Sequence, residues 1–600
     1  MMKTNLTGSA LFSIVLNSYT QNNESVIMNS NFFLDEPIHD FDVVNELGFR
    51  KGINSFIKLF DVFRNPGGLI ITENNFDILS GILQSPNDYG KGISSFNSTF
   101  QASSNTFNNL DFGLISGASN TLNTFSFKCN TLTNMIHGAH ISGIDYFQMH
   151  TNNIQIAGEA HPYGIYMENC TGYMLEQNTL SYNSSNWNLN PAGLINYFAT
   201  PNNNINEIRN NTFSNFKYGM VMEGENRSNF NYNDGLELWC NTLENYEYAM
   251  AVTHPPGIAG IQNGPASTKG ANNLFESYGC NFSNEGELYN PAGNNPFRYV
   301  HKLNSSTDYV EPVSGCFTVT QVTLQQISQF FDLSIDCPTT IFDCSPVLLT
   351  VNPVTSNSNN TSILKIKTDS INAPLSELDI NKKIRFYLHD SGISNPEDSI
   401  ISLIQTTNSI GRNYLLAFAF EKSGSDSNRA VQLNSLNNDS IYAGLNSIAT
   451  ITDSVNWNEL KSNNSEKADL TAIAMDSSKY AYTAARNILR NVYDELFPEV
   501  IILPSTATTQ PRIARNKEDS EVKIYPNPFT SELIIDLTGL EDVYEVVLIN
   551  ILGVEMQRMT LAGNQNYKLS TTSLSSGLYF IHIICKDLRV YSELLNHVSH

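Results

Sequence analysis

The sequence has few charged residues, and most of them are acidic. Asp, Glu, Lys and Arg make up 15% of the 600 residues, against about 25% in ordinary soluble domains. Lys and Arg number 34 against 58 Asp and Glu, which gives a formal net charge of −24. Because binding to a phosphate backbone requires a basic surface, this balance argues against nucleic acid as a partner.

Several other features are missing. No stretch approaches the roughly 20 consecutive apolar residues that span a bilayer, so no transmembrane segment is expected. The chain also lacks a glycine-rich phosphate loop, a Gly-x-Ser-x-Gly elbow and a His-Glu-x-x-His zinc helix, and no cofactor is predicted. Hydrophobic residues still make up 41% of the chain, which is enough to build packed cores.

Asparagine is the residue in excess, and it is concentrated in the first half of the chain. It supplies 50 of the first 300 residues and then becomes less frequent. Asn is unfavourable inside helices because its side-chain amide competes for backbone hydrogen bonds. The composition therefore predicts turns and stacked side-chain ladders.

The Asn-rich half contains a repeat. In each copy Asn-Thr-(Phe or Leu) is followed, eight residues after the Asn, by a small residue and then by alternating apolar residues. Clear copies begin at Asn105, Asn130, Asn211 and Asn241, with Gly113, Gly138, Gly219 and Ala249 at the small position, and weaker copies begin at Asn75, Asn153, Asn178 and Asn273. From Asn105 onward the steps between copies are 23 to 33 residues, which suits one coil of a solenoid.

Alternating apolar residues predict short strands, and stacked coils would bury the apolar face that one coil cannot bury alone. We expect each repeat Asn at a corner, where its amide donates to one neighbouring coil and accepts from the other. The small residue is expected at another corner or at a crowded interior position. This pattern resembles the right-handed parallel β-helix of the pectate-lyase-like superfamily. A leucine-rich repeat is the alternative solenoid, but its Leu-x-x-Leu-x-Leu spacing is absent.

The resemblance raises the question of catalysis, because polysaccharide lyases and glycoside hydrolases of this superfamily act from one exposed sheet. The candidate catalytic residues are His137, His140, Glu159 and His161, which stacked coils could bring together as an acid–base or metal group. Ordinary surface or corner residues are the commoner explanation for such a set. The sequence therefore favours a structural, adhesive or carbohydrate-binding role, with a lyase or hydrolase as the alternative.

Eight cysteines are present. Cys129 and Cys240 each stand directly before a repeat Asn and are predicted to be free, buried thiols. A second group closes the β-rich half and could form two disulfides of open connectivity in an oxidising compartment: Cys280, Cys316, Cys337 and Cys344. Zinc is the alternative for this group, although Cys-x-x-Cys pairs are absent.

The carboxyl-terminal segment carries a distinct set of motifs. They are Tyr525-Pro526-Asn527-Pro528, then Gly553, and then Gly577-Leu578-Tyr579. This segment resembles the type A carboxyl-terminal sorting domain of the type IX secretion system, found in Bacteroidetes, over residues 520–600. The resemblance implies a small β-sandwich read by the outer-membrane translocon and a passenger that is secreted or attached to surface lipopolysaccharide. Its inner faces are expected to carry Ile534, Val546, Leu548, Tyr579 and Ile581.

The predicted fold class is mainly β. A parallel β-helix over 1–345 is followed by a linker at 346–373, a small α-helical hairpin domain at 374–500, a linker at 501–519 and the sorting domain at 520–600. Residues 10–16 make a poor signal peptide, so we expect the chain to be a fragment that lacks earlier coils. The predicted partners are the type IX translocon and an extracellular polysaccharide or surface lipopolysaccharide.

Overall fold

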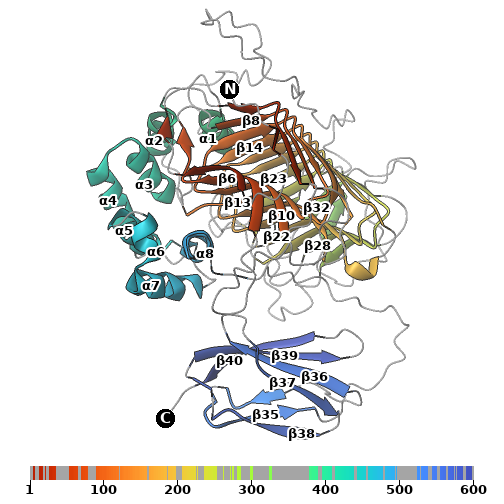
Figure 1. The fold of residues 1–600 in the computed structure, drawn as a ribbon. Helices are drawn as coiled ribbons and strands as arrows, with labels where there is room; N and C mark the ends of the chain where they lie inside the picture. Colours follow the sequence, from red (N-terminus) through yellow and green to blue (C-terminus); the bar gives the residue numbers. More distant parts are fainter. Residues whose placement is uncertain are drawn as a thin grey trace, which may run out of the picture. The chain divides into compact units, whose positions relative to one another are not determined.

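The computed structural model forms two compact units, residues 1–495 with 499–504 and residues 496–498 with 505–600 (Figure 1). Apart from short internal gaps, it describes residues 5–34, 53–78, 89–284, 298–301, 323–326, 377–497 and 523–597. The described helices belong to the first unit together with three large parallel sheets. The second unit is a small sandwich of antiparallel strands.

Successive coils of the first unit give their strands to three sheets, here named A, B and C, and the first and last described coils give none to sheet A. Sheet A consists of β4 Val26–Met28, β8 Leu69–Thr72, β11 Phe100–Ser103, β14 Phe125–Lys128, β17 Gln148–His150, β20 Met174–Glu176, β23 Asn206–Arg209 and β26 Leu236–Trp239. Sheet B consists of β1 Asn5–Leu6, β5 Asn31–Leu34, β9 Asn75–Ile78, β12 Thr106–Asn108, β15 Thr131–Met135, β18 Asn153–Ile156, β21 Thr179–Tyr182, β24 Thr212–Ser214, β27 Thr242–Glu244 and β30 Leu274–Phe275. Sheet C consists of β2 Phe12–Asn17, β6 Ile53–Phe60, β10 Tyr89–Phe96, β13 Phe112–Gly117, β16 His137–Ser142, β19 Tyr163–Glu168, β22 Ala192–Tyr197, β25 Tyr218–Glu223, β28 Tyr248–Val252 and β31 Cys280–Asn284.

Every strand of these sheets pairs in parallel with the equivalent strands of the neighbouring coils, which confirms the predicted right-handed β-helix. A 3-10 helix, η1 Trp187–Leu189, interrupts one coil. Further parallel pairings join β3 Thr20–Gln21 to β7 Phe63–Arg64, and β29 Ile261–Gln262 to β32 Arg298–His301 and β33 Thr323–Gln326.

An asparagine ladder joins the corners between sheets A and B. Its buried members are Asn74, Asn105, Asn130, Asn152, Asn178, Asn211, Asn241 and Asn273. Each Nδ2 donates to the Oδ1 of the next Asn at 2.8–3.1 Å. The same Oδ1 accepts the backbone N–H of the preceding Asn at 2.9–3.1 Å. Nδ2 also donates to a sheet A carbonyl one coil earlier, at 2.8–3.1 Å. The predicted amide ladder is therefore confirmed.

At two coils the sequence pattern placed the repeat Asn one residue too far along the chain. The ladder uses Asn74 and Asn152, whereas the sequence pattern predicted Asn75 and Asn153. Asn75 and Asn153 begin strands β9 and β18, and Asn153 is exposed. In both places two Asn follow each other, so the repeat has two possible registers, and a shift of one residue reverses the face on which a side chain lies.

The corners provide a second reason for the abundance of Asn. The residue before each ladder Asn from Asn74 to Asn241 has a left-handed backbone, with φ between 54° and 57°. Other corners place Asn97, Asn109, Asn134, Asn169, Asn190, Asn215 and Asn245 in the same region. Asn tolerates this conformation better than most residues because its short polar side chain forms local hydrogen bonds.

The small repeat residue lies at a crowded interior position. A Cβ added at Gly138 would lie 2.3 Å from the carbonyl oxygen of Gly164, and one added at Gly219 would lie 2.5 Å from that of Ala249. Aromatic rings stack along the same interior, as in Phe32–Phe76 at 4.8 Å. Close approach of neighbouring coils, rather than a positive φ, therefore explains the small residue.

The helices follow the solenoid in the chain, as predicted. The described ones are α1 Glu377–His389, α2 Pro396–Thr407, α3 Asn413–Lys422, α4 Asp426–Leu436, α5 Leu445–Ser454, α6 Trp457–Lys461, α7 Asn464–Ala474 and α8 Ala481–Val492. They pack on the corner that leads from sheet C to sheet A (Figure 1). At this corner Trp457 Nε1 donates to Asp61 Oδ2 at 3.1 Å and Asn487 Nδ2 donates to the Ala118 carbonyl at 2.8 Å. Helices and solenoid therefore form one compact unit.

The second unit is the predicted β-sandwich. One sheet contains β34 Lys523–Tyr525, β35 Glu532–Asp536 and β38 Asn566–Ser570, and the other contains β37 Glu555–Ala562, β36 Val543–Asn550, β39 Gly577–Cys585 and β40 Val590–His597. Val546, Leu548, Tyr579 and Ile581 lie in the core between them, as expected. Ile534 was assigned to the wrong face, because Leu533 and Ile535 are the buried residues of β35. Three consecutive apolar residues left this register undetermined in the sequence.

We expect Asn152→Ala to lower the free energy of unfolding by about 3 kcal/mol, because it leaves several buried hydrogen-bonding groups without a partner. The control is Asn153→Ala, which removes the exposed amide of the next residue and is expected to change stability by about 0.5 kcal/mol or less. Urea denaturation followed by circular dichroism measures both. Equal effects of the two variants would contradict the role assigned to the ladder.

Candidate functional site

Two of the candidate catalytic histidines, His137 and His140, lie on the outer face of sheet C against aromatic rings. The His137 ring centroid lies 4.6 Å from that of Phe112 and 4.2 Å from that of Tyr163. His140 stacks on Tyr166 at 4.9 Å and is buried. His161 is exposed before β19, and Glu159 lies outside the described residues. A catalytic role for these four residues stays a prediction.

The cysteines correct one expectation. Cys129 and Cys240 are disulfide-bonded rather than free. They lie four strand spacings apart along sheet A, roughly 19 Å, which is too far for a bond to each other. Among the cysteines whose side chains are described, Cys170 is free and buried, and burial raises its pKa well above the usual value. The side chains of Cys280, Cys316, Cys337 and Cys344 lie outside the described residues, so their pairing stays a prediction.

Ionisable side chains from neighbouring coils converge on the outer face of sheet A. This sheet A column consists of Lys128, His150, Glu176, Arg209 and Trp239, which follow one another in register on β14, β17, β20, β23 and β26. The residue before each of the four ionisable members is buried in the solenoid core, so these four side chains lie on the opposite face, whereas Trp239 itself belongs to the buried core cluster. Each member stands two residues before a ladder Asn. Sequence reasoning missed the column although this spacing would have located it.

The column is held together by charge pairing and burial. Arg209 Nη2 lies 2.9 Å from Glu176 Oε2, and the Arg209 guanidinium carbon lies 4.9 Å from the centroid of the Trp239 ring. Burial, followed by the charges of Lys128 and His389, lowers the pKa of His150 to about 3. His150 is therefore neutral at ordinary pH, between a cationic and an anionic neighbour.

Helix α1 lies beside this column. Arg385 forms a salt bridge with Glu207, and its Nη1 donates to the carbonyl of Gly172 at 2.7 Å. Burial opposes ionisation of Glu207, but Arg385, Arg209 and Lys382 outweigh it and hold its pKa below the usual value.

Helix α3 and the start of helix α8 meet two more acidic side chains of the same corner. The hydroxyls of Tyr414 and Tyr480 donate to Asp145 Oδ2 at 3.2 and 3.1 Å. Burial raises the pKa of Asp145 to about 8, although these hydrogen bonds oppose the shift. The Tyr482 hydroxyl donates to Glu168. We call these contacts of Asp145, Glu168 and Glu207 with the helices the polar seam.

The two clusters differ in composition rather than in burial. The three carboxyl groups of the polar seam are buried and have partners on the helices, and His150 and Glu176 of the sheet A column are buried as well. The sheet A column contains a neutral imidazole beside cationic and anionic groups, the residue types that transfer protons. Within the described part of the chain, no group of three or more His, Cys, Asp or Glu side chains could hold a metal ion.

We expect Arg385→Met to lower the stability of helix α1 on the solenoid by about 3 kcal/mol, because the buried carboxylate of Glu207 loses its nearest cation. Hydrogen exchange measured by mass spectrometry would show this as faster exchange in α1 peptides. The matched control is Asp453→Asn, which removes the half-exposed partner of Arg429 and is expected to cost about 0.5 kcal/mol. Unchanged exchange in α1 would contradict a stabilising polar seam.

We expect His150→Gln to make the protein less sensitive to acid. The folded-state pKa of about 3 lies below the unfolded value, so this histidine contributes stability above pH 6.5 that is lost as the pH falls toward 3. Between pH 6.5 and pH 3, the His150→Gln variant is expected to lose less free energy of unfolding than the wild type, by up to about 1.4 kcal/mol per pH unit. Urea denaturation at a series of pH values measures the slope. The exposed His161→Gln serves as control and is expected to leave it unchanged.

Comparison with known proteins identifies the carboxyl-terminal unit alone. Residues 523–594 match the family described as secretion system C-terminal sorting domain. This match supports the resemblance in the sequence and makes the chain a cargo of the type IX secretion system, directed to the cell surface or the extracellular space. No curated protein and no solved structure matches the chain. Among the described helices, none is long and apolar enough to cross a membrane.

Proposed function

We propose that the passenger of this chain acts outside the cell as a structural or adhesive protein that binds extracellular carbohydrate. The observation that supports it best is the asparagine ladder, which fixes eight successive coils in register and makes each sheet a regular surface. A regular surface suits a polymer with a repeating structure, because many weak contacts act together. Surface lipopolysaccharide, implied by the sorting domain, is a second carbohydrate partner.

Four described residues of the sorting motif are exposed, and a fifth is buried. Tyr525, Pro526, Asn527 and Gly577 are exposed, whereas Tyr579 is buried and its hydroxyl donates to the Ser575 carbonyl at 2.7 Å. Gly577 begins β39, while Gly553 and Pro528 lie outside the described residues. We infer that Tyr525 contributes to the surface that the translocon reads.

A polysaccharide lyase or glycoside hydrolase of the pectate-lyase-like kind is the second candidate function. It is favoured by the sheet A column, where Lys128, His150 and Glu176 from three successive coils lie side by side. In such an enzyme one of these groups would remove or supply a proton during cleavage of the glycan.

One experiment separates the two functions. The full chain is screened against pectic, alginate and neutral polysaccharides, with affinity electrophoresis for binding and absorbance for unsaturated products. Retention without product supports the adhesive proposal. Product that disappears in Glu176→Gln, or in the His137→Gln/His140→Gln pair, would replace it with the enzymatic one. If no polysaccharide retards the protein and none is cleaved, carbohydrate binding is wrong.

We expect Tyr525→Ser to reduce the amount of protein at the cell surface several-fold, because it removes an exposed aromatic side chain of the sorting motif. Met556→Ser is the matched control: the side chains of Tyr525 and Met556 are 42% and 41% exposed, and Met556 lies outside the motif. Immunoblots of cell fractions from a host with a type IX system measure both. Equal export of the two variants would show that Tyr525 is not read.

A further inference from the structure

The outer face of sheet B carries a regular array of hydroxyl and amide groups. Its first column is Thr106, Thr131, Asn153, Thr179, Thr212 and Thr242, in register on β12 to β27. Its second column is Asn108, Thr133, Gln155, Ser181 and Ser214, with an irregularity after Leu132. These eleven residues are here named the sheet B face.

The hydrogen-bonding groups of this face are open. Among the described residues, only Ser214 of the eleven uses its side chain in a hydrogen bond, a long one to the Leu180 carbonyl at 3.5 Å. Thr131, Asn153 and Thr179 are exposed. The ladder Asn, by contrast, use their amides within the protein. Hydroxyls and amides both donate and accept, so the face can match a partner that does the same.

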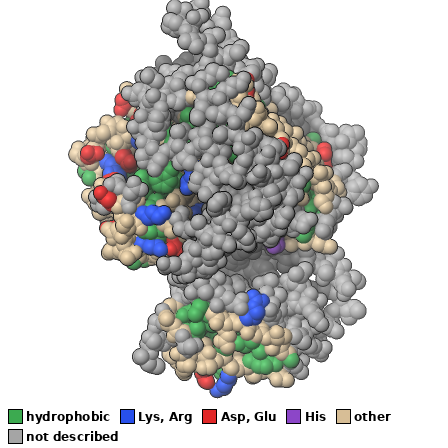
Figure 2. All heavy atoms as spheres, viewed as in Figure 1, with side chains coloured by type: hydrophobic (Ala, Val, Ile, Leu, Met, Phe, Trp, Pro, Cys, Tyr) green, Lys and Arg blue, Asp and Glu red, His purple; other side chains and the backbone are tan. Residues whose placement is uncertain are grey.

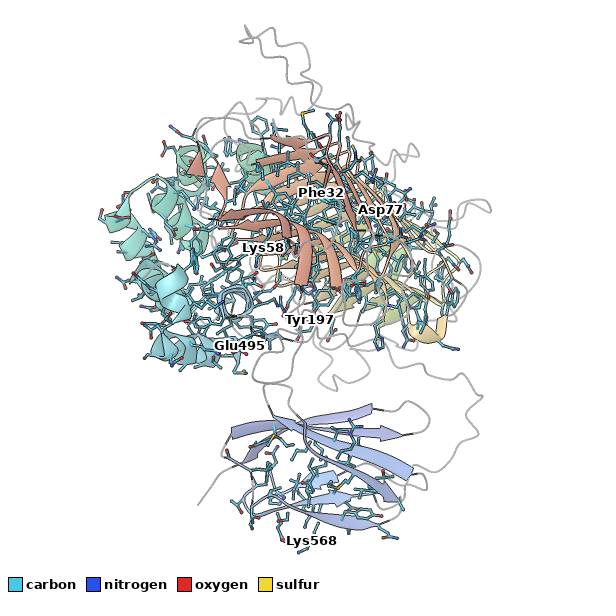
Figure 3. The ribbon with its side chains drawn as sticks, in the orientation of Figure 1. Phe32, Lys58, Asp77, Tyr197, Glu495 and Lys568 are labelled. Atoms are coloured by element: carbon cyan, nitrogen blue, oxygen red, sulfur yellow. The ribbon has the colours of Figure 1, made fainter. Side chains whose placement is uncertain are left out.

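The face is also uncharged. None of the eleven residues is ionisable, and the first carboxylates along the columns are Asp77 on β9 and Glu244 on β27, at the two ends. The cationic side chains Lys128, Arg209 and Arg385 belong instead to sheet A and helix α1. Lys and Arg side chains are visible among the helices in Figure 2, and in Figure 3 the labelled Asp77 lies on the side of the solenoid away from them.

We propose that the sheet B face binds an uncharged polysaccharide. This inference rests on the carbohydrate-binding function proposed above and names the surface and the ligand class. Sugar hydroxyls donate and accept as Thr, Asn and Gln do, and the face has no cation with which to pair a carboxylate or sulfate. A net charge of −24 further repels acidic polymers.

The repeat of the face favours a polymer over a single sugar. Six strands at the spacing of a parallel sheet extend over roughly 24 Å, so an extended chain meets equivalent groups in each coil. Each contact is weak, but contacts along one chain add because they are linked.

The test uses the full chain in affinity electrophoresis with xyloglucan, mixed-linkage β-glucan and galactomannan as neutral probes, and polygalacturonate and alginate as acidic ones. Retardation is expected in at least one neutral gel. The triple variant Thr131→Val, Thr179→Val and Thr212→Val keeps the β-branched shape and removes three hydroxyls, so the apparent Kd is expected to rise at least about tenfold. Thr406→Val with Thr450→Val, exposed hydroxyls on helices α2 and α5, is the control and is expected to bind as the wild type does.

The outcomes are distinct. If only the acidic polysaccharides retard the protein, it binds carbohydrate, but the proposal that the ligand is uncharged is wrong. If neutral polysaccharides retard the triple variant as strongly as the wild type, the sheet B face is not the binding surface. If the triple variant fails to fold, Asn153→Lys tests the same face, because a cation there is expected to weaken neutral binding and promote retention by polygalacturonate. Absence of any retardation would remove the proposed function itself.

Discussion

The side-chain amide of one asparagine per coil is the interaction on which the solenoid depends. At Asn130 and Asn152, Oδ1 accepts two hydrogen bonds and Nδ2 donates two, so the amide of one residue joins three successive coils. Replacement by a longer or apolar side chain would leave backbone groups buried and unpaired. The constant register of the three sheets and the regular columns on their outer faces follow from this repeated contact.

The helices are attached in a different way. The solenoid interior is apolar and stacked, whereas the contacts of Asp145, Glu168 and Glu207 with the helices are polar and buried. Polar contacts of this kind fix one arrangement, because a displaced helix would leave a buried carboxylate without its donors. Apolar packing thus stabilises the coils, and directional hydrogen bonds decide where the helices lie on them.

The sequence predicted the features that repeat and missed those that join distant residues. The β-helix, the amide ladder and the inner face of the sandwich at Leu548 and Ile581 follow from periodicity. The predicted register was wrong at Asn74 and at Ile535, because neighbouring residues of the same kind satisfy the pattern equally well. The pairing of Asp145 with Tyr414 and Tyr480 joins residues 269 and 335 positions apart, and no local pattern marks it. The disulfide bond of Cys129 could not be predicted, because a position beside the ladder suits a buried thiol as well as a half-cystine.

The corner covered by the helices limits how such a solenoid can change in length. Coils between ladder residues vary from 22 residues, between Asn130 and Asn152, to 33, between Asn178 and Asn211, so loops are tolerated wherever the ladder amide is kept. In a solenoid each coil contacts only its neighbours, so a whole coil can be added without changing how the others pack. Here the helices contact the coils from Asp61 to Glu207, and an added coil in that interval would displace every later contact by one strand spacing. The contacts with the helices therefore fix the number of coils between Asp61 and Glu207. We expect duplication of a coil to be tolerated only outside this segment.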